Sequence, residues 1–473
     1  MRARARSTPW SIRSRRISIS ALLLLALLTT TTFVPAARGE ESPATPTLPP
    51  KGQVVPKFAT LADPAKSYAL YLPSAYDPTR RSPIVYLLDA RGVALNPIER
   101  YRAGAERYGF ILASAYDSAS DVPHGDPNLE ALQTMWTDTH ARLAIDDRRV
   151  YVGGFSGTVR SACAIATLAP GKIAGILASA AGFPPEMPPN RQTPFLFFGT
   201  TGDRDFNFTE MFELDAKLSA LELPHRIEEF AGPHDWCPEP LATAGLEWME
   251  LQAMKAGIRE RDPALIEALW SARAADARAL EAAGKPFPAW HRWQAMSEDF
   301  TGLRDVAEAS REAVRLNGEK AVRTFREERA ARAARDGQYL RGAYRTLGDL
   351  AIASDPGAVR RLVGSLRIAD LKADVAKRGE TEKGLESARL LSALSGQTSF
   401  YLPREAMEKK EFARAARYLE IAVDINPENP GAWYNLAAAR ARGGNTAGAL
   451  EALRRGVAVG ISNPDRLEGD PDF

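Results

Sequence analysis

Short apolar runs alternate with amphipathic stretches between about residues 66 and 250. The apolar runs are "SYALYLP", "PIVYLLD", "GFILASA", "VYVGGF", "GILASAAG", "PFLFFGT" and "HRIEEFAG". Most are continuous rather than alternating, as is typical of strands buried on both faces of a sheet. Helical stretches such as "IERYRAGAERY" and "LEALQTMWTDTHARL" separate them. This alternation predicts an α/β domain with a mainly parallel sheet, over residues 59–255, which closes its own core before the chain continues.

Beyond residue 256 the pattern becomes helical throughout. Residues 256–404 are rich in Ala, Arg and Glu with helical periodicity, and we assign no chemistry to them. Over residues 405–465, Ala415, Leu419 and Ala422 recur 34 residues later as Ala449, Leu453 and Gly456. This period resembles the tetratricopeptide repeat, a pair of helices with small residues where they cross. Two units are few for a solenoid, so we expect the preceding helices to complete an all-α stack that offers a surface to a protein partner.

The N-terminal residues have the pattern of an export signal. Residues 1–39 join a basic stretch, the apolar core "ISISALLLLALL" and small residues suited to cleavage. That core is short for a membrane span, so we expect a periplasmic or secreted protein with no stable span after removal of the signal. Residues 40–58 are rich in Pro and are interpreted as a linker into the folded body.

Charge and cysteine content narrow the class of protein. The formal net charge is +2, but the first 39 residues carry seven arginines and no acid, and without them 54 basic residues face 59 acidic ones. A mature chain without a basic excess argues against a nucleic-acid partner. The two cysteines, Cys163 and Cys237, leave room for one disulfide or for two buried thiols. No close His/Asp/Glu cluster has the spacing of metal ligands, and we expect neither a metal nor a cofactor.

The stretch "VYVGGFSGTVRSA" places Ser156 at an abrupt turn from a predicted strand into a predicted helix. This is the context of a nucleophile elbow, in which a strained turn exposes a serine hydroxyl. The usual pattern is G-x-S-x-G, and here Thr158 stands in place of the last glycine. A serine in a Gly-rich turn with no catalytic role is the alternative interpretation.

An acid and a base follow the serine in the order that such an enzyme requires. The strand "PFLFFGT" leads into a loop with Asp203 and Asp205, and "HRIEEF" leads into a loop with His234. A histidine must remove the serine proton during attack, and a carboxylate must orient that histidine. We predict His234 as the base and Asp205 as the acid, with Asp203 as the second choice. The other histidines, His124, His140, His225 and His291, are interpreted as surface or packing residues.

Negative charge that develops on a substrate oxygen needs two backbone N–H donors. We predict that Gly157, the residue after the nucleophile, supplies one of them. The second is expected from residues 89–92, which follow the strand "PIVYLLD", and Arg91 is the candidate.

A family resemblance rests on three of these segments, "IDDRRVYVGGFSGTVRSA", "RYGFILASAYDS" and "GPHDW". Together they resemble secreted α/β-hydrolase esterases related to polyhydroxybutyrate depolymerases and feruloyl esterases, over roughly residues 60–250. The resemblance implies hydrolysis of carboxylic esters through Ser156, His234 and Asp205 or Asp203. Thr158, and "LLDARG" where many relatives carry a His-Gly pair, depart from the family and concern the elbow and the oxyanion loop.

The leading hypothesis is therefore a secreted serine esterase, with a small-molecule or polymeric ester as substrate and a helical repeat domain. A second hypothesis is a binding or scaffold protein whose hydrolase-like domain is inactive and whose repeats recruit a partner. A third is a serine peptidase, because ester and amide hydrolysis use the same triad. The order of serine, acid and histidine favours the first.

Overall fold

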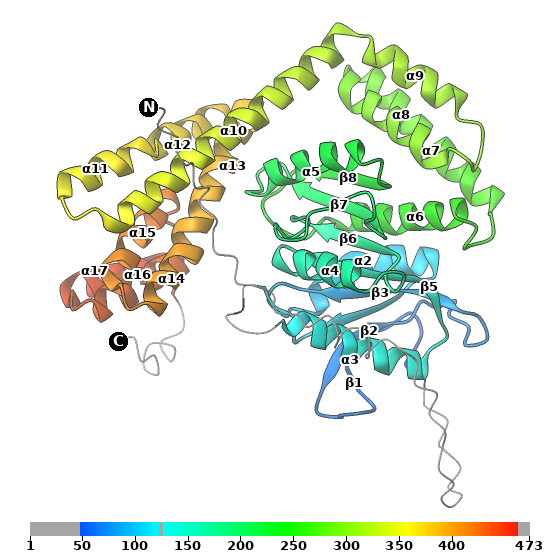
Figure 1. Ribbon diagram of the computed structural model, residues 1–473, viewed down its shortest axis with the longest axis horizontal. Helices are drawn as coiled ribbons and strands as arrows, with labels where there is room; N and C mark the ends of the chain where they lie inside the picture. Colours follow the sequence, from blue (N-terminus) through cyan, green and yellow to red (C-terminus); the bar gives the residue numbers. More distant parts are fainter. Residues whose placement is uncertain (1–47, 121, 123–125, 462–473) are drawn as a thin grey trace, which may run out of the picture. The chain divides into compact units, whose positions relative to one another are not determined.

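A computed structural model describes residues 48–120, 122 and 126–461 (Figure 1). The predicted signal, residues 1–39, lies outside the described residues. The chain divides into two compact units. The first holds the described residues up to Ala178 with Gly182–Phe198 and Ala242–Glu247, and the second holds Ser179–Ala181, Gly199–Leu241 and the described residues from Trp248 onward.

Eight strands form one sheet in the order β1-β2-β4-β3-β5-β6-β7-β8. The strands are β1 Val54–Ala59, β2 Ser67–Tyr71, β3 Ser82–Leu88, β4 Ile111–Ala115, β5 Ile145–Phe155, β6 Gly175–Ser179, β7 Leu196–Gly202 and β8 His225–Phe230. β3 pairs in parallel with both β4 and β5, whereas β2 pairs antiparallel with β1 and β4. The sheet is therefore mixed, with its antiparallel strands at the N-terminal end of the order.

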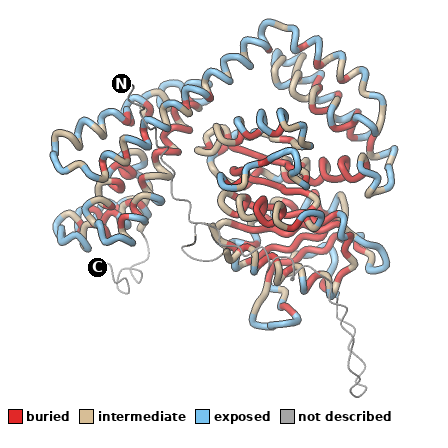
Figure 2. Tube along the Cα trace, viewed as in Figure 1, coloured by how far each residue is buried: buried red, intermediate tan, exposed pale blue. Residues whose placement is uncertain are grey.

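The seven apolar runs of the sequence all form strands, which confirms that part of the prediction. β3, β4 and β6 are almost entirely buried, and the strands of the sheet are largely red in Figure 2. β1 is different: residues 54–58, which the sequence assigned to the linker, form a strand instead. Most of its side chains are half-buried or exposed, so β1 lacks the apolar run that identified the other strands.

The helices that accompany the strands alternate with them along the chain. They are α2 Leu95–Tyr108, α3 Pro127–Arg142, α4 Gly157–Leu168, α5 Phe208–Ala220 and α6 Glu239–Lys255. Asp126 caps the start of α3, where its side chain accepts the Asn128 N–H at 3.0 Å, and Gly109 caps the end of α2 in the left-handed conformation. Both caps are common at helix ends. The order of strands and helices along the chain confirms the predicted βα alternation.

All elements after α6 in the described chain are helical, as predicted. They are α7 Pro263–Ala282, α8 Pro286–Phe300, α9 Ala307–Asn317, α10 Lys320–Ile352, α11 Pro356–Ser365, α12 Ile368–Arg378, α13 Glu382–Gly396, a π-helical turn Gln397–Tyr401, α14 Leu402–Glu408, α15 Phe412–Ile425, α16 Pro430–Arg442 and α17 Thr446–Ala458.

Packing in the second unit crosses the boundary that we predicted at residue 255. Leu251 and Met254 of α6 share one buried cluster with residues of α7, α8 and α9. Arg226 of β8 forms a buried ion pair with Asp299 of α8 at 2.8 Å, and the Trp248 indole N–H donates to the same carboxylate at 2.9 Å. Burial alone would raise the pKa of Asp299, but the charges of Arg226 and Arg273 hold it below its usual value. The last strand of the sheet is thus anchored to the helical region.

The repeat predicted from the 34-residue period coincides with α14 to α17. Ala415, Leu419, Ala422 and Ala449 are buried, and most of them lie in a cluster that also holds Leu436 and Ala437. A Cβ atom on Gly456 would come within 3.1 Å of the Trp433 Cβ, so the small residue is needed where α17 meets α16. The recurring small residues therefore mark helix crossings, as expected.

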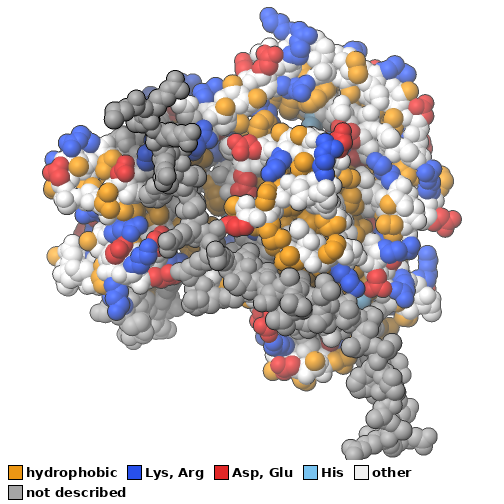
Figure 3. Space-filling model, in the orientation of Figure 1, with side chains coloured by type: hydrophobic (Ala, Val, Ile, Leu, Met, Phe, Trp, Pro, Cys, Tyr) orange, Lys and Arg blue, Asp and Glu red, His pale blue; other side chains and the backbone are white. Residues whose placement is uncertain are grey.

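Three observations concern the surface, the cysteines and the character of the helices. Acidic and basic side chains are interspersed on the face that Figure 3 shows. Cys163 and Cys237 are both buried thiols. Within the described ranges, no helix combines the length and the apolar character that a membrane crossing requires.

Candidate active site

Ser156 stands at the corner between β5 and α4, as the sequence predicts for an elbow. Its backbone has φ 57° and ψ −126°, a conformation that residues with a side chain rarely adopt. Such strain costs on the order of 1–3 kcal/mol and persists where the surroundings enforce it, often at functional sites. The alternative interpretation, a serine in a Gly-rich turn with no catalytic role, does not account for this strain.

Two glycines allow the elbow to form. A Cβ atom on Gly154 would lie 2.8 Å from the Val159 backbone nitrogen, so β5 and α4 approach each other only because residue 154 has no side chain. A Cβ on Gly157 would lie 2.6 Å from the Ser120 hydroxyl oxygen, in the loop after β4. These contacts supply the physical reason for the small residues on both sides of Phe155 and Ser156.

Thr158, the departure from the usual elbow motif, is fully buried and ties the turn together. Its hydroxyl oxygen lies 2.6 Å from the Leu88 carbonyl oxygen and 2.9 Å from that of Phe155, and it accepts the Phe155 N–H at 2.9 Å. The β-branched residue therefore links the ends of β3 and β5 through its hydroxyl. A glycine at this position would lose all three contacts.

Of the two predicted oxyanion donors, Gly157 begins α4, where the first backbone N–H groups have no partner inside the helix. Arg91 is at odds with the prediction, because its N–H donates to the Asp89 carboxylate at 2.8 Å. The same carboxylate oxygen accepts the Val93 N–H at 3.1 Å. The sequence prediction did not consider that the buried Asp89 carboxylate could accept hydrogen bonds from the N–H groups that follow it, as Asp side chains commonly do in turns.

Asp205 and His234 form a hydrogen-bonded pair within the second unit. His234 Nδ1 lies 2.8 Å from Asp205 Oδ1, and Asp205 is fully buried while the histidine side chain is 16% exposed. The Asn207 N–H donates to the same Asp205 oxygen at 2.7 Å, which fixes the carboxylate. A buried carboxylate on Nδ1 leaves Nε2 as the imidazole atom that can exchange a proton.

Phe206 is a further member of this arrangement that the sequence did not reveal. Its ring stacks on the His234 ring with centroids 3.9 Å apart and 29° between the planes. The imidazole is thus oriented by Asp205 at its edge and by Phe206 on its face.

Asp203, the second choice for the acid, has a different position. Its carboxylate accepts the Gly232 N–H at 3.0 Å, and its own N–H donates to the Phe230 carbonyl oxygen at 2.9 Å. The Arg204 N–H adds a bond to the Gly232 carbonyl at 3.0 Å. Asp203 therefore joins the acid loop, residues 203–207, to the histidine loop, residues 231–238.

The remaining histidines have packing contacts, except His124, which lies outside the described residues. His140 stacks on Trp136 with centroids 4.5 Å apart, and burial lowers its pKa. His225 contacts Asp215 at 3.3 Å, and His291 lies beside Trp290 in α8. No group of three or more His, Cys, Asp or Glu side chains that could hold a metal occurs in the described part of the chain.

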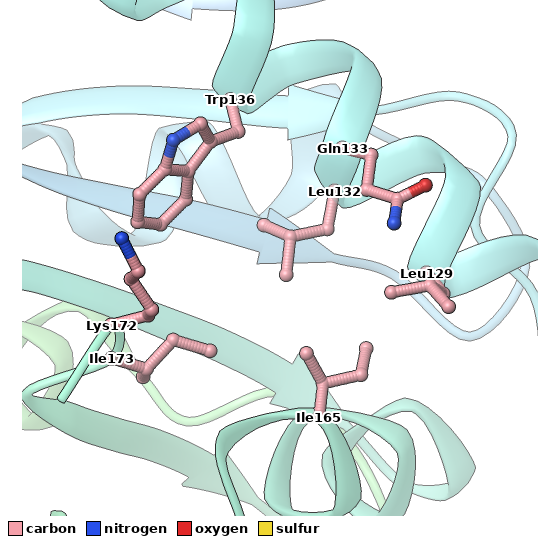
Figure 4. Close-up of a pocket in the computed structure, with 7 residues that line it drawn as sticks. All are labelled: Leu129, Leu132, Gln133, Trp136, Ile165, Lys172 and Ile173. Carbon is pink, nitrogen blue, oxygen red and sulfur yellow. The ribbon is translucent and has the colours of Figure 1, made fainter. Parts of the chain in front are cut away.

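Two cavities differ greatly in size. One of about 20 Å³ lies between α3 and α4 (Figure 4). It has room for about one water molecule and is a packing defect rather than a substrate site. A cavity of about 960 Å³ lies in the second unit among α5, β8, α7, α8 and α10. Its walls combine aromatic rings with arginine side chains: Phe212, Phe287, Trp290, Arg292, Arg323, Arg326 and Arg329.

Comparison with known proteins identifies the repeats. A tetratricopeptide-repeat family model matches residues 406–460. No curated protein is significantly similar to the chain in sequence.

Solved structures similar to this chain include a serine hydrolase, a ferulic acid esterase and a dipeptidyl peptidase. The chain is similar to the fluorophosphonate-binding serine hydrolase F of Staphylococcus aureus, at 13% identity, with 42% of this chain and 99% of that chain covered and a TM-score of 0.35. It is similar to a ferulic acid esterase of Anaeromyces mucronatus at 15% identity, with 41% and 87% covered and a TM-score of 0.31. For dipeptidyl peptidase 4 of Porphyromonas gingivalis the identity is 10%, the coverage 42% and 35%, and the TM-score 0.31.

The architecture is that of an α/β-hydrolase followed by an all-α repeat region. This assignment rests on the mixed eight-stranded sheet, on the strained strand–serine–helix turn after β5, and on loops after β7 and β8 that carry Asp205 and His234.

Proposed function

We propose that this protein is an exported serine hydrolase that cleaves carboxylic esters through Ser156, His234 and Asp205. The observation that carries the proposal is the 2.8 Å contact between His234 Nδ1 and the buried Asp205 carboxylate. The strained backbone of Ser156 supports it, because this conformation is the one an exposed nucleophile on an elbow needs.

In the proposed reaction, His234 Nε2 accepts the Ser156 hydroxyl proton while the serine oxygen attacks the ester carbonyl carbon. Asp205 stabilises the resulting imidazolium and remains ionised. The tetrahedral intermediate places negative charge on the former carbonyl oxygen, which the Gly157 N–H and one donor from residues 89–92 would stabilise. Its collapse expels the alcohol, which takes the proton from His234, and leaves an acyl group on Ser156. A water molecule activated by His234 then releases the carboxylic acid.

Covalent labelling tests this proposal directly. A fluorophosphonate probe reacts with an activated serine, and we expect the label on Ser156 by peptide mapping, with no label on Ser156→Ala. Absence of label on the wild-type chain would refute the triad and favour an inactive scaffold that acts through its repeats. Comparison of p-nitrophenyl acetate with peptide p-nitroanilides then separates an esterase from a serine peptidase.

Export is part of the proposal and has its own test. The basic stretch, apolar core and small residues of 1–39 predict cleavage near residues 37–40. N-terminal sequencing of the protein from the periplasm or medium should return a start in that range. A start at Met1 would contradict export with cleavage. The repeats at 406–460 support, as a further proposal, contact with a protein partner.

A further inference from the structure

We infer that Arg389, in helix α13 of the helical region, is a positioning residue that holds the acid loop in place for catalysis. The inference rests on the proposed function, since it assigns Arg389 a role in the orientation of Asp205 and His234. Arg389 does not contact the reacting groups: it acts through Asp203 and Phe208.

Three contacts place the Arg389 guanidinium between the acid loop and the helical region. Its Nη1 donates to the Asp203 carbonyl oxygen at 3.0 Å, and its Nη2 lies 3.4 Å from the Asp336 carboxylate of α10. The guanidinium carbon lies 4.4 Å from the centre of the Phe208 ring, the first residue of α5. One side chain therefore contacts the first residue of the acid loop and the residue that directly follows the loop.

The contact between Arg389 and Asp336 lies in the interior of the unit and not on its surface. The Arg389 and Asp336 side chains are 8% and 2% exposed. Removal of a guanidinium from water costs free energy unless its charge and its N–H donors are paired. An apolar side chain at position 389 would avoid that cost. Burial raises the pKa of Asp336 to about 6, and the charge of Arg389 opposes that rise. Burial of the Arg389–Asp336 pair therefore lowers the free energy of unfolding relative to an apolar pair at these positions.

Arg389 adds an anchor in the helical region to the other bonds of the acid loop. Asp203 and Arg204 attach it to Phe230 and Gly232. Those bonds join the acid loop to the end of β8 and to the histidine loop, and the Asn207 side-chain amide donates to the Ala180 carbonyl oxygen at 2.8 Å. α13 and α10 are long helices packed in a common core, and Arg389 connects the acid loop to them. Because a displacement of about 1 Å at a catalytic group can reduce the rate about 100-fold, this connection bears on activity.

A second arginine strengthens the argument from the same helices. Arg329 of α10 forms an ion pair with Glu229 of β8, and its guanidinium lies 5.5 Å from the centre of the Phe208 ring. Phe208 is thus in contact with two arginines of the helical region. The start of α5, which directly follows the acid loop, therefore lies against arginine side chains of α10 and α13.

Substitution of Arg389 tests the inference. Arg389→Met keeps the length of the side chain and removes all its donors, whereas Arg389→Lys keeps the charge and one donor. Arg455→Met is the control, because Arg455 is 67% exposed and, among the described residues, pairs only with Glu451 of the same helix. We measure kcat and KM for p-nitrophenyl acetate, the rate at which the fluorophosphonate probe labels Ser156, the pH–rate profile and the thermal midpoint.

For Arg389→Met we expect kcat and the labelling rate to fall about 10- to 100-fold with KM nearly unchanged. The acid limb of the pH–rate profile should move to lower pH, because a displaced Asp205 stabilises the imidazolium less. Arg389→Lys should recover part of the loss, and Arg455→Met should match the wild type. Rates within twofold of the wild type, or a loss equal to the unfolded fraction by circular dichroism, would overturn the inference. If the Met variant does not fold, the Lys variant decides by the same criteria.

A spectroscopic measurement separates this inference from the proposed function. The Nδ1 proton shared by His234 and Asp205 should give a low-field NMR signal, assigned by its absence in His234→Gln. We expect Arg389→Met to weaken or shift that signal while Arg455→Met leaves it in place. If Ser156 takes no label but the signal depends on Arg389, the proposed function fails and the positioning role stands. If Ser156 is labelled and the signal ignores Arg389, the positioning role fails and the proposed function stands.

Discussion

Gly202 lies so close to the histidine loop that a Cβ atom at this position would come within 2.3 Å of the Gly232 carbonyl oxygen. Gly202 is the last residue of β7 and immediately precedes the acid loop. The overlap is with backbone atoms, which cannot swing aside as a flexible side chain would. The absence of a side chain at residue 202 therefore sets the distance between the loops that carry Asp205 and His234.

Gly202→Ala should push these two loops apart. We expect a loss of about 1–3 kcal/mol in the free energy of unfolding, typical of overpacking, and a fall in kcat of about 10-fold or more. Urea denaturation and ester hydrolysis measure the two effects. Gly342→Ala is the matched control, since a Cβ there would meet nothing within 4 Å, and it should leave activity unchanged. Normal kcat in Gly202→Ala would mean that the loop separation is not critical.

The two aspartates of the acid loop should respond differently to the same substitution. Asp205→Asn removes the charge that faces His234, and we expect kcat to fall about 10⁴-fold, as for the acid of a serine triad. Asp203→Asn keeps an oxygen that can accept the Gly232 N–H, so we expect less than a 10-fold effect. Steady-state kinetics of both variants assign the acid. The opposite order of effects would make Asp203 the triad acid.

Thr158 should stabilise the elbow through its hydroxyl rather than crowd it. Thr158→Val keeps the shape but leaves the Phe155 N–H and the Leu88 carbonyl without this partner. A typical intramolecular hydrogen bond contributes about 0.5–1.5 kcal/mol, so we expect a loss of about 1–3 kcal/mol in stability and lower activity. Thr158→Ser, which retains the hydroxyl, is the control and should stay near the wild type. A more stable Val variant would show instead that the hydroxyl is dispensable.

His225 should make stability depend on pH. Burial lowers its pKa, but bonds to Asp215 and to the Leu223 carbonyl outweigh that effect and raise it above the usual 6.5. Its two ring nitrogens lie 3.3 Å from Asp215 and 2.7 Å from the Leu223 oxygen, so both act as donors in the charged form. A raised pKa stabilises the fold fully below the unfolded value, and this contribution is lost as pH rises through the folded value.

We therefore expect His225→Gln to destabilise the protein by roughly 1 kcal/mol at pH 5.5 and by less at pH 8.5. Chemical denaturation at the two pH values measures the difference. In an Asp215→Asn background the effect of pH on the His225 substitution should shrink, because the partner charge is gone. A destabilisation that is equal at both pH values would contradict the charged-pair interpretation.

Local sequence patterns predicted the strands of the sheet and the turn at Ser156. They did not predict contacts between residues that are far apart in the sequence. The strands β2 to β8 were recognisable because buried strands are continuous apolar runs, whereas β1 has mostly half-buried or exposed positions and no such run. Chain order placed Asp205 and His234 in the loops after β7 and β8, and in the structure these two side chains lie 2.8 Å apart. The sequence ranked Asp205 ahead of Asp203 without excluding Asp203, because two residues in one loop differ only in the direction of their side chains.

Arg91 and Arg389 show the two ways in which sequence reasoning failed at the site. The Arg91 N–H was a candidate donor until the buried Asp89 carboxylate was found to accept it, an interaction two residues long that depends on the turn. Arg389 is separated from Asp203 by 186 residues, in a helix whose Ala-, Arg- and Glu-rich surroundings give no sign of a role. Only the packing of α13 against the acid loop identifies it.

Shortened chains test where the catalytic unit ends. From the sequence, a chain that stops near residue 256 should keep esterase activity. In the structure, however, Asp299, the buried partner of Arg226 and Trp248, comes later, and Leu251 and Met254 pack against α7 to α9. Removal of one partner of a buried ion pair costs about 3–5 kcal/mol. We therefore expect the chain ending at 256 to aggregate or to lose most of its activity.

A chain that ends at residue 318 separates stability from positioning. It retains α7 to α9 and the Arg226–Asp299 pair but lacks α10 and α13, so we expect it to fold with a kcat reduced about as much as in Arg389→Met. Addition of residues 319–473 in trans should restore part of the rate if α10 and α13 can dock again. Full kcat in the chain ending at 256 would instead place all of the chemistry within residues 59–255 and leave the helices to the binding of partners. Purified chains of the three lengths, compared by labelling of Ser156 and by kcat, distinguish these outcomes.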